Sequence, residues 1–251
     1  MAHVIALAGK GGTGKTTVAC LLIRLLKDKG AGSILAIDAD PNSNLAEACG
    51  VAASDSVGSI LEDISKDPKS IPAGVSKDSF INYQVQTAIS EGEGFDLLTM
   101  GRSEGPGCYC YVNNVLRGII ERTTKDYDYI VIDNEAGLEH LSRRTMRRAD
   151  VLLIVSDPSR IGLKSAQRID ALAKELEFKV AKRLLITNRA DQRIKDELLE
   201  ELGLEPEYLG NIPEDHYIGK NSLNGASLMK LDGGSKALQA LEEIGGRIWQ
   251  V

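Results

Sequence analysis

The residues with the most specific spacing in this chain are glycines, lysines and threonines that directly follow the first apolar stretch, residues 4–8. From Gly9 to Thr16 they fit the pattern Gly-x-x-x-x-Gly-Lys-Ser/Thr, and an apolar helical stretch follows. The loop N–H groups and the helix N-terminus of such a segment can surround a polyphosphate. Lys15 would neutralise phosphate charge, and the Thr16 hydroxyl would reach a magnesium ion. The predicted phosphate-binding residues are Gly11, Gly12, Thr13, Gly14, Lys15, Thr16 and Thr17.

A second lysine, Lys10, stands inside the same loop. The wording Lys-Gly-Gly-Thr-Gly-Lys-Thr resembles the deviant Walker A motif of the MinD, ParA and nitrogenase iron protein group of dimeric ATPases. The resemblance implies a homodimer in which Lys10 reaches the partner's nucleotide and stabilises charge as the γ-phosphate leaves. Lys10 and Lys15 would then both be catalytic residues. The alternative for Lys10 is a solvated loop lysine.

Two aspartates, Asp38 and Asp40, follow the second apolar run with one residue between them. In an extended segment both side chains point to the same side, so both can serve one phosphate site. In the ATPases that the loop resembles, Asp-x-Asp-Pro at this place forms switch I. The resemblance assigns Asp40 to orienting the attacking water and Asp38 to an indirect magnesium contact. A structural cap or turn is the alternative.

Later strand ends carry further residues of the same resemblance. Asp133 stands where a Walker B aspartate would, and Gly137 would donate its N–H to the γ-phosphate within switch II. Asn188 resembles the base-reading asparagine of the group, because an amide both donates to and accepts from adenine. The segment expected to line the base through backbone atoms is Ile212, Pro213, Glu214 and Asp215. The last two clusters favour ATP over GTP.

Cys108 and Cys110 form a second feature that could do chemistry. In an extended segment the two thiols face the same way, but they supply only half of a tetrahedral or square-planar ligand set. A twofold axis would supply the other half, so the thiols and Lys10 both require a dimer. Four thiolates suit Ni²⁺, Zn²⁺ or an iron–sulfur cluster, and Cys-x-Cys alone does not choose among them. Two ordinary cysteines are the alternative. Cys20 and Cys49 lie in apolar helical contexts and are expected in the core.

These motifs together resemble the CooC family, including its AcsF relatives, and they span residues 9–215. The resemblance implies an ATPase that assists nickel insertion into carbon monoxide dehydrogenase or acetyl-CoA synthase. ATP would close the dimer while Cys108 and Cys110 of both protomers hold one Ni²⁺, with Zn²⁺ as a competitor at the same thiolates. Hydrolysis of ATP to ADP would change that interface, so that the metal passes to the client enzyme.

Two other functions use the same kind of domain. An iron–sulfur electron carrier like nitrogenase iron protein takes one cluster cysteine from each of two separate segments, whereas Cys108 and Cys110 share one segment. A ParA- or MinD-like positioning ATPase, bound to DNA or to a membrane, would leave the thiol pair unexplained. Both are therefore disfavoured.

The elements that must position these residues alternate between short β-rich runs and amphipathic stretches. This pattern predicts a single α/β domain over 1–251, a P-loop NTPase fold with a mostly parallel sheet of about seven strands and helices on both faces. Ligands bind outside the carboxyl ends of such strands, so the polar clusters should converge there. Residues 54–94 read as a helix-and-loop excursion, and 234–249 as the last helix. The predicted strands are 3–8, 34–37, 97–100, 129–132, 151–155, 183–187 and 207–211.

Composition and charge limit the cellular compartment and the kinds of partner that we expect for this protein. The 251 residues are 43% hydrophobic, enough for a large core, and no apolar run approaches the length of a membrane span. The chain opens directly into the first strand, which predicts a cytoplasmic protein. A net charge of −6 argues against nucleic acid or anionic lipid as a partner. One basic cluster, which we expect to be solvated or ion-paired, comprises Arg143, Arg144, Arg147 and Arg148.

Overall fold

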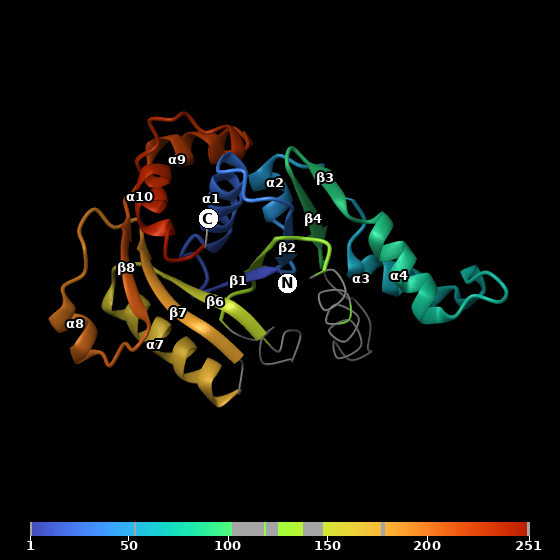
Figure 1. Cartoon of the computed structure of the whole chain (residues 1–251), viewed down its shortest axis with the longest axis horizontal. Coiled ribbons are helices and arrows are strands. Elements are labelled where there is room, and N and C mark those ends of the chain that lie inside the picture. Colours follow the sequence, from blue (N-terminus) through green and yellow to red (C-terminus); the bar gives the residue numbers. More distant parts are fainter. Residues whose placement is uncertain are drawn as a thin grey trace.

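All seven predicted strands are present in the computed structural model, which describes residues 2–52, 54–101, 118, 125–137, 148–176 and 179–249. Within these residues one sheet has the strand order β3-β4-β2-β5-β1-β6-β7-β8 (Figure 1). Every pair is parallel except β3 with β4. The α/β fold is confirmed, with eight strands where about seven were expected. The strands are β1 (His3–Ala8), β2 (Ile34–Ala39), β3 (Ser90–Gly92), β4 (Phe95–Thr99), β5 (Tyr129–Asn134), β6 (Arg148–Ser156), β7 (Lys179–Asn188) and β8 (Glu207–Ile212).

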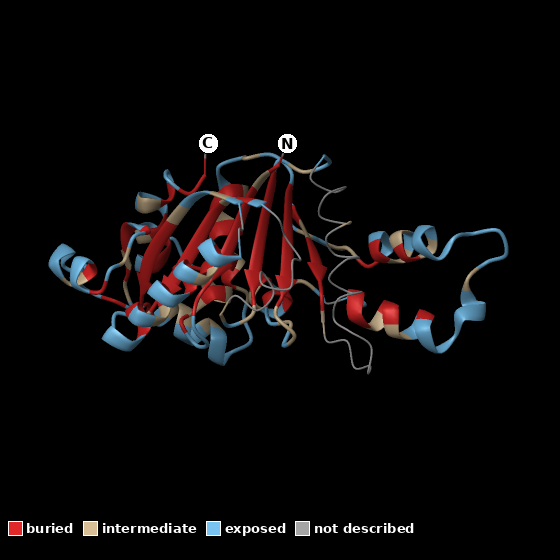
Figure 2. Ribbon diagram, turned by 90° about the horizontal axis from the view of Figure 1, so that it is seen from below, coloured by how far each residue is buried: buried red, intermediate tan, exposed pale blue. Residues whose placement is uncertain are grey.

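The central strands are buried along almost their whole length, as is typical of a parallel sheet covered on both faces (Figure 2). Alternate side chains of each strand enter two separate cores. One core joins the sheet to α1, α2 and α10, and the other joins it to α3, α4, α7 and α8. The helices are α1 (Lys15–Asp28), α2 (Leu45–Cys49), α3 (Val57–Lys66), α4 (Lys77–Thr87), α7 (Arg160–Glu175), α8 (Asp196–Glu201), α9 (His216–Leu223) and α10 (Lys236–Gly245).

Strand register brings the predicted carboxylates together. β5 lies between β1 and β2, and its pairing places Asp133 opposite Leu7 on one side and Asp38 on the other. The three strands end at the same edge of the sheet, where the loop before α1 also lies. The convergence that parallel topology predicts is therefore confirmed for the residues at the carboxyl ends of β1, β2 and β5.

The predicted excursion is a helical arm that extends sideways from the β3 edge of the sheet (Figures 1 and 2). It contains α3, the short 3-10 helix η1 (Pro68–Ser70) and α4. Ser56 caps α3 by accepting from the N–H of Ser59, whose hydroxyl in turn accepts from the N–H of Ser56. Ser76 caps α4 in a simpler way. Local capping therefore fixes where both helices begin.

The last helix is shorter than the sequence predicts. α10 ends at Gly245, and a tight turn brings the buried Trp249 back against that glycine. A Cβ at position 245 would lie 1.9 Å from the Trp249 ring, so only glycine fits there. No helix in the part of the chain that the structure describes is long and apolar enough to cross a membrane. Of the basic cluster, Arg148 lies in β6 and pairs with Asp150 at 3.3 Å, while its other three arginines lie outside the described residues.

Candidate functional site: a phosphate loop facing buried carboxylates

The predicted phosphate loop runs from the end of β1 to the start of α1. Gly14 precedes the helix with a left-handed φ of 88°, and a Cβ there would lie 2.3 Å from Nδ2 of Asn188. Glycine is therefore required both by the backbone and by the neighbouring side chain. Inside the loop, the Thr13 hydroxyl donates to the carbonyl of Lys10 at 2.9 Å. The loop is thus shaped by its own contacts.

The two loop lysines have opposite environments. Lys15 is 7% exposed, and its ammonium lies 3.5 Å from the Lys10 carbonyl. Burial lowers the pKa of Lys15, while the charges of Asp133, Asp40 and Glu135 counteract that shift. The side chain of Lys10 is exposed. The Lys15 side chain is therefore buried in the site, whereas the Lys10 side chain is exposed to solvent.

Asp133 forms the floor of the site. Its Oδ2 accepts from the Thr16 hydroxyl at 2.6 Å, and its buried Oδ1 has no hydrogen-bond partner among the described residues. Burial raises the pKa of Asp133 to about 6, against the hydrogen bond from Thr16 and the charge of Lys15. A hydroxyl oxygen beside an orphaned carboxylate oxygen is the hard donor set that Mg²⁺ prefers. The residues present therefore fit a magnesium ion.

Asp38 anchors the loop after β2. Its side chain is fully buried, and its two oxygens accept from the N–H groups of Asp40, at 3.1 Å, and Leu45, at 2.8 Å. Burial raises the pKa of Asp38 to about 7 in spite of these bonds, and the charge of Asp133 adds to the shift. The Asp40 carboxylate is half-buried and accepts from the N–H of Asn42 at 2.8 Å. Asp40 thus shapes a turn, and its charge also acts to raise the pKa of Lys15.

The loop after β5 is tied to the phosphate loop. The Gly137 N–H donates to the Gly9 carbonyl at 3.0 Å, so a contact from this N–H to a γ-phosphate would require exchange of that bond. Asn134, a strand-end polar residue to which the sequence assigned no role, donates from Nδ2 to the Leu7 carbonyl at 2.8 Å. Its position next to Asp133 at a strand end was the available signal.

Two residues at the end of β7 contact the phosphate loop from the other side. Asn188 is buried, and its Nδ2 donates to the carbonyl of Thr13 at 2.8 Å. Arg189, a strand-end polar residue to which the sequence assigned no role, has a left-handed φ of 54° and donates from its guanidinium to the Gly12 carbonyl. In this structure Asn188 therefore holds the loop, and its contact with a base stays a prediction.

The segment after β8 is fixed by Asp215. This buried carboxylate accepts from the Ser235 hydroxyl at 2.7 Å, from the Ala237 N–H at 3.0 Å and from the Tyr217 N–H at 2.8 Å. Burial alone would raise its pKa, but these hydrogen bonds outweigh burial and lower it. Asp215 thus ties α9 to α10. Of its neighbours Ile212 is buried, Pro213 half-buried and Glu214 exposed.

Comparison with known proteins identifies the family. A family model described as an AAA domain, AAA_31, matches residues 2–186. The chain belongs to this family of P-loop ATPases. An uncharacterized ATP-binding protein of Methanocaldococcus jannaschii is 42% identical over 250 residues, covering 98% of each chain. The carbon monoxide dehydrogenase accessory protein CooC of Rhodospirillum rubrum is 33% identical over 227 residues, covering 85% of this chain and 84% of that protein.

Solved structures agree on the fold of the ATPase. The septum site-determining protein MinD of Pyrococcus horikoshii, complexed with Mg-ADP, has a TM-score of 0.72 at 23% identity and covers 100% of this chain and 97% of that one. A ParA family ATPase of Chlorobium tepidum has a TM-score of 0.73 at 23% identity, covering 100% and 99%. At these identities the likeness shows the fold alone.

The four cysteines of the ATPase fall into two pairs. Cys20 and Cys49 are buried, as predicted, and the Cys20 thiol lies 3.4 Å from the Ala48 carbonyl. Cys108 and Cys110 lie outside the described residues. Within the described ranges no group of three or more His, Cys, Asp or Glu side chains has the arrangement of a metal site. The predicted Cys108/Cys110 site therefore stays a prediction.

Proposed function

We propose that this ATPase is a nickel metallochaperone. A homodimer holds Ni²⁺ through Cys108 and Cys110 of both protomers and passes it to a client nickel enzyme, carbon monoxide dehydrogenase or acetyl-CoA synthase. The observation that carries the proposal is the Cys-Tyr-Cys sequence in a chain 33% identical to the CooC accessory protein of R. rubrum. Thiolate ligands suit Ni²⁺ and Zn²⁺ alike, so geometry and metal supply decide which ion is carried.

The phosphate loop is the ATP site in this proposal. Loop N–H groups and the Lys15 ammonium bind the polyphosphate, while Thr16 and Asp133 hold Mg²⁺. The ion, when bound, neutralises charge on the phosphate oxygens. Asp40 orients the attacking water, and the exposed Lys10 of one protomer contacts the nucleotide of the other. Asn188 and residues 212–215 line the adenine.

Coupling between nucleotide and metal follows from chain connectivity. The Met100 N–H donates to the Asp38 carbonyl at 2.8 Å, which ties the end of β4 to the loop that carries Asp40. Cys108 follows Met100 along the same chain by only eight residues. A change at Asp38 on hydrolysis would therefore reach Met100, eight residues before Cys108. If ATP favours the same dimer as the metal, each ligand raises the affinity for the other.

The test is equilibrium dialysis of reduced protein against Ni²⁺ under anaerobic conditions. We expect one tight nickel site per two chains in the wild type and its loss in Cys108→Ser/Cys110→Ser. The matched control, Cys20→Ala/Cys49→Ala, removes the same number of thiols from the core and should keep the site. Equal nickel binding by Cys108→Ser/Cys110→Ser and the wild type would disprove the thiolate site, and ATP hydrolysis would still stand.

A further inference from the structure

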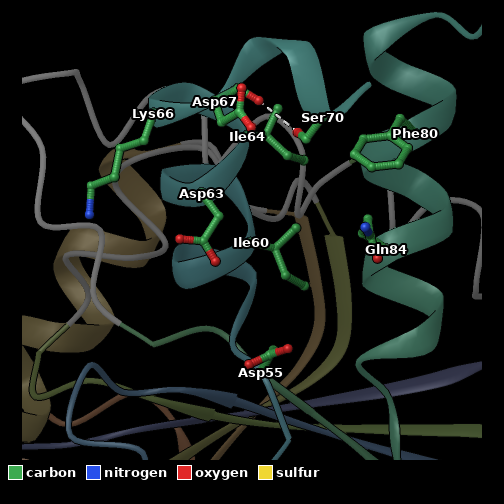
Figure 3. A pocket seen from close by; sticks show the side chains of 9 residues that line it. All are labelled: Asp55, Ile60, Asp63, Ile64, Lys66, Asp67, Ser70, Phe80 and Gln84. Atoms are coloured by element: carbon green, nitrogen blue, oxygen red, sulfur yellow. Dashed lines mark hydrogen bonds between the residues drawn. The ribbon is translucent and has the colours of Figure 1, made fainter. Parts of the chain in front are cut away.

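We propose that the helical arm carries a docking site for a cationic segment of a partner protein. Its basis is a cavity of about 400 Å³ between α3 and α4 (Figure 3). Ile60, Ile64 and Phe80 form its apolar wall, and the carboxylates of Asp55, Asp63 and Asp67 stand around it. The proposal does not depend on nickel, because these residues lie outside the phosphate site and the cysteine pair.

The charge around this cavity is negative. Asp55, Asp63 and Asp67 are all exposed, so their charges face solvent. Lys66 also lines the cavity, but its side chain extends to the side of α3 away from Phe80, and its ammonium pairs with Glu62 at 2.5 Å (Figure 3). A cationic partner therefore meets a complementary surface. Phosphate groups of lipids or nucleic acids would be repelled, which leaves a basic protein segment as the occupant.

The wall of the cavity specifies the apolar part of that segment. Ile60 and Ile64 lie one turn apart on α3, and Phe80 faces them from α4 (Figure 3). One turn along α4 from Phe80, Tyr83 is 63% exposed. Tyrosine is enriched among the residues that contribute most of the binding energy of protein interfaces. An aliphatic side chain of the partner would enter between the helices while neighbouring Arg or Lys residues reach the carboxylates.

The arm is also joined to the phosphate edge. The Gly58 N–H at the start of α3 donates to the Met100 carbonyl at 2.9 Å, and Met100 in turn donates to the Asp38 carbonyl. Two backbone hydrogen bonds thus connect the first turn of the arm to the strand that carries Asp38. A partner docked on the arm would be held close to Met100, at the end of β4.

The test is fluorescence anisotropy with the full-length protein and a labelled peptide in which two leucines are flanked by arginines. Asp55→Lys/Asp63→Lys should weaken binding about tenfold or more, since it reverses the charge next to the cavity. The control, Glu200→Lys/Glu243→Lys, makes the same change in net charge at exposed positions of α8 and α10 and should bind like the wild type. Tyr83→Ser should weaken binding without any change in charge.

Three results would overturn the proposal. A peptide with glutamates in place of arginines could bind equally well, or the two charge variants could lose affinity equally. The third is that Asp55→Lys/Asp63→Lys alters self-association in light scattering while peptide binding is unchanged, which would make the arm an interface between copies of this chain. Circular dichroism and ATP binding of each variant show that a lost interaction is not a lost fold.

Discussion

Aspartates at the phosphate edge and aspartates on the arm are the same residue type in opposite environments. At the edge, Asp38 and Asp133 are buried, and burial raises the pKa of both. On the arm, Asp55 and Asp63 are exposed. A buried carboxylate without a full set of partners destabilises the empty protein, whereas an exposed one has little effect. In our proposals the edge carboxylates serve a magnesium ion, and the arm carboxylates meet a cationic partner.

The largest expected difference between the phosphate edge and the arm is in the turnover number for ATP hydrolysis. Asp40→Asn should lower kcat for ATP hydrolysis by about a hundredfold, because an amide is a poor partner for the attacking water. Nucleotide binding should persist, since Lys15 and the loop remain. Asp78→Asn, at an exposed position on the arm, is the matched control and should hydrolyse ATP normally. Steady-state kinetics checks both, and equal kcat values would remove Asp40 from the reaction.

A smaller effect is expected on magnesium. Thr16→Ala removes the hydroxyl that bonds to Asp133, so the apparent affinity for Mg²⁺ in the ATPase assay should fall by about tenfold. Thr87→Ala removes a hydroxyl on the arm that bonds to the Gln84 carbonyl and should leave the magnesium requirement unchanged. A magnesium titration separates the two variants. If Thr16→Ala kept the wild-type affinity, the hydroxyl and Asp133 would not form the ion's site.

The next effect is a pH dependence of stability at the phosphate edge. The pKa of Asp38, about 7 when folded, lies above its ordinary value of 3.8, so the folded protein binds this proton more tightly. That stabilisation is complete below the ordinary value and is lost as pH rises through about 7. Asp38→Asn stays neutral, so it should melt roughly 5 °C above the wild type at pH 8. At pH 5 the two should differ much less.

Differential scanning calorimetry of the nucleotide-free proteins measures this change. Asparagine keeps one acceptor oxygen for the two N–H groups, and the comparison at pH 5 reports the loss of the other. A melting difference that does not vary between pH 5 and pH 8 would contradict a raised pKa at Asp38.

The smallest effect is expected on the arm itself. Asp63→Asn should change the free energy of unfolding by no more than about 0.5 kcal/mol, because the side chain is exposed. A urea titration at pH 7 checks it, and a much larger change would show that this carboxylate is structurally engaged.

Much of this arrangement is predictable from sequence because strong local patterns coincide with the topology. Apolar runs become the buried strands, and parallel pairing then places Asp38 beside Asp133. Contacts that depend on one particular side chain or on strand pairing are less accessible. Trp249 folds back on Gly245 beyond the end of α10, and the short antiparallel strand β3 depends on pairing with β4.

At the site, too, sequence predicts residues more readily than the contacts they make. The loop lysines and strand-end aspartates belong to motifs, so sequence singles them out. Asn134 and Arg189 contact the carbonyls of Leu7 and Gly12 across the site; their strand-end positions indicate a place near the site, but not these contacts. Asn188 illustrates a mixed case, since its position was predicted and its bond to the Thr13 carbonyl was not.

The most direct test of a nucleotide-linked nickel dimer is anaerobic size-exclusion chromatography with light scattering and metal quantification. Reduced Asp40→Asn protein, which should retain ATP, is run with Ni²⁺ in the presence and absence of ATP. We expect a dimer with one nickel per two chains, and a larger dimer fraction when both ligands are present. Elution without nickel under every nucleotide condition would contradict the metallochaperone function and leave a P-loop ATPase with another cargo.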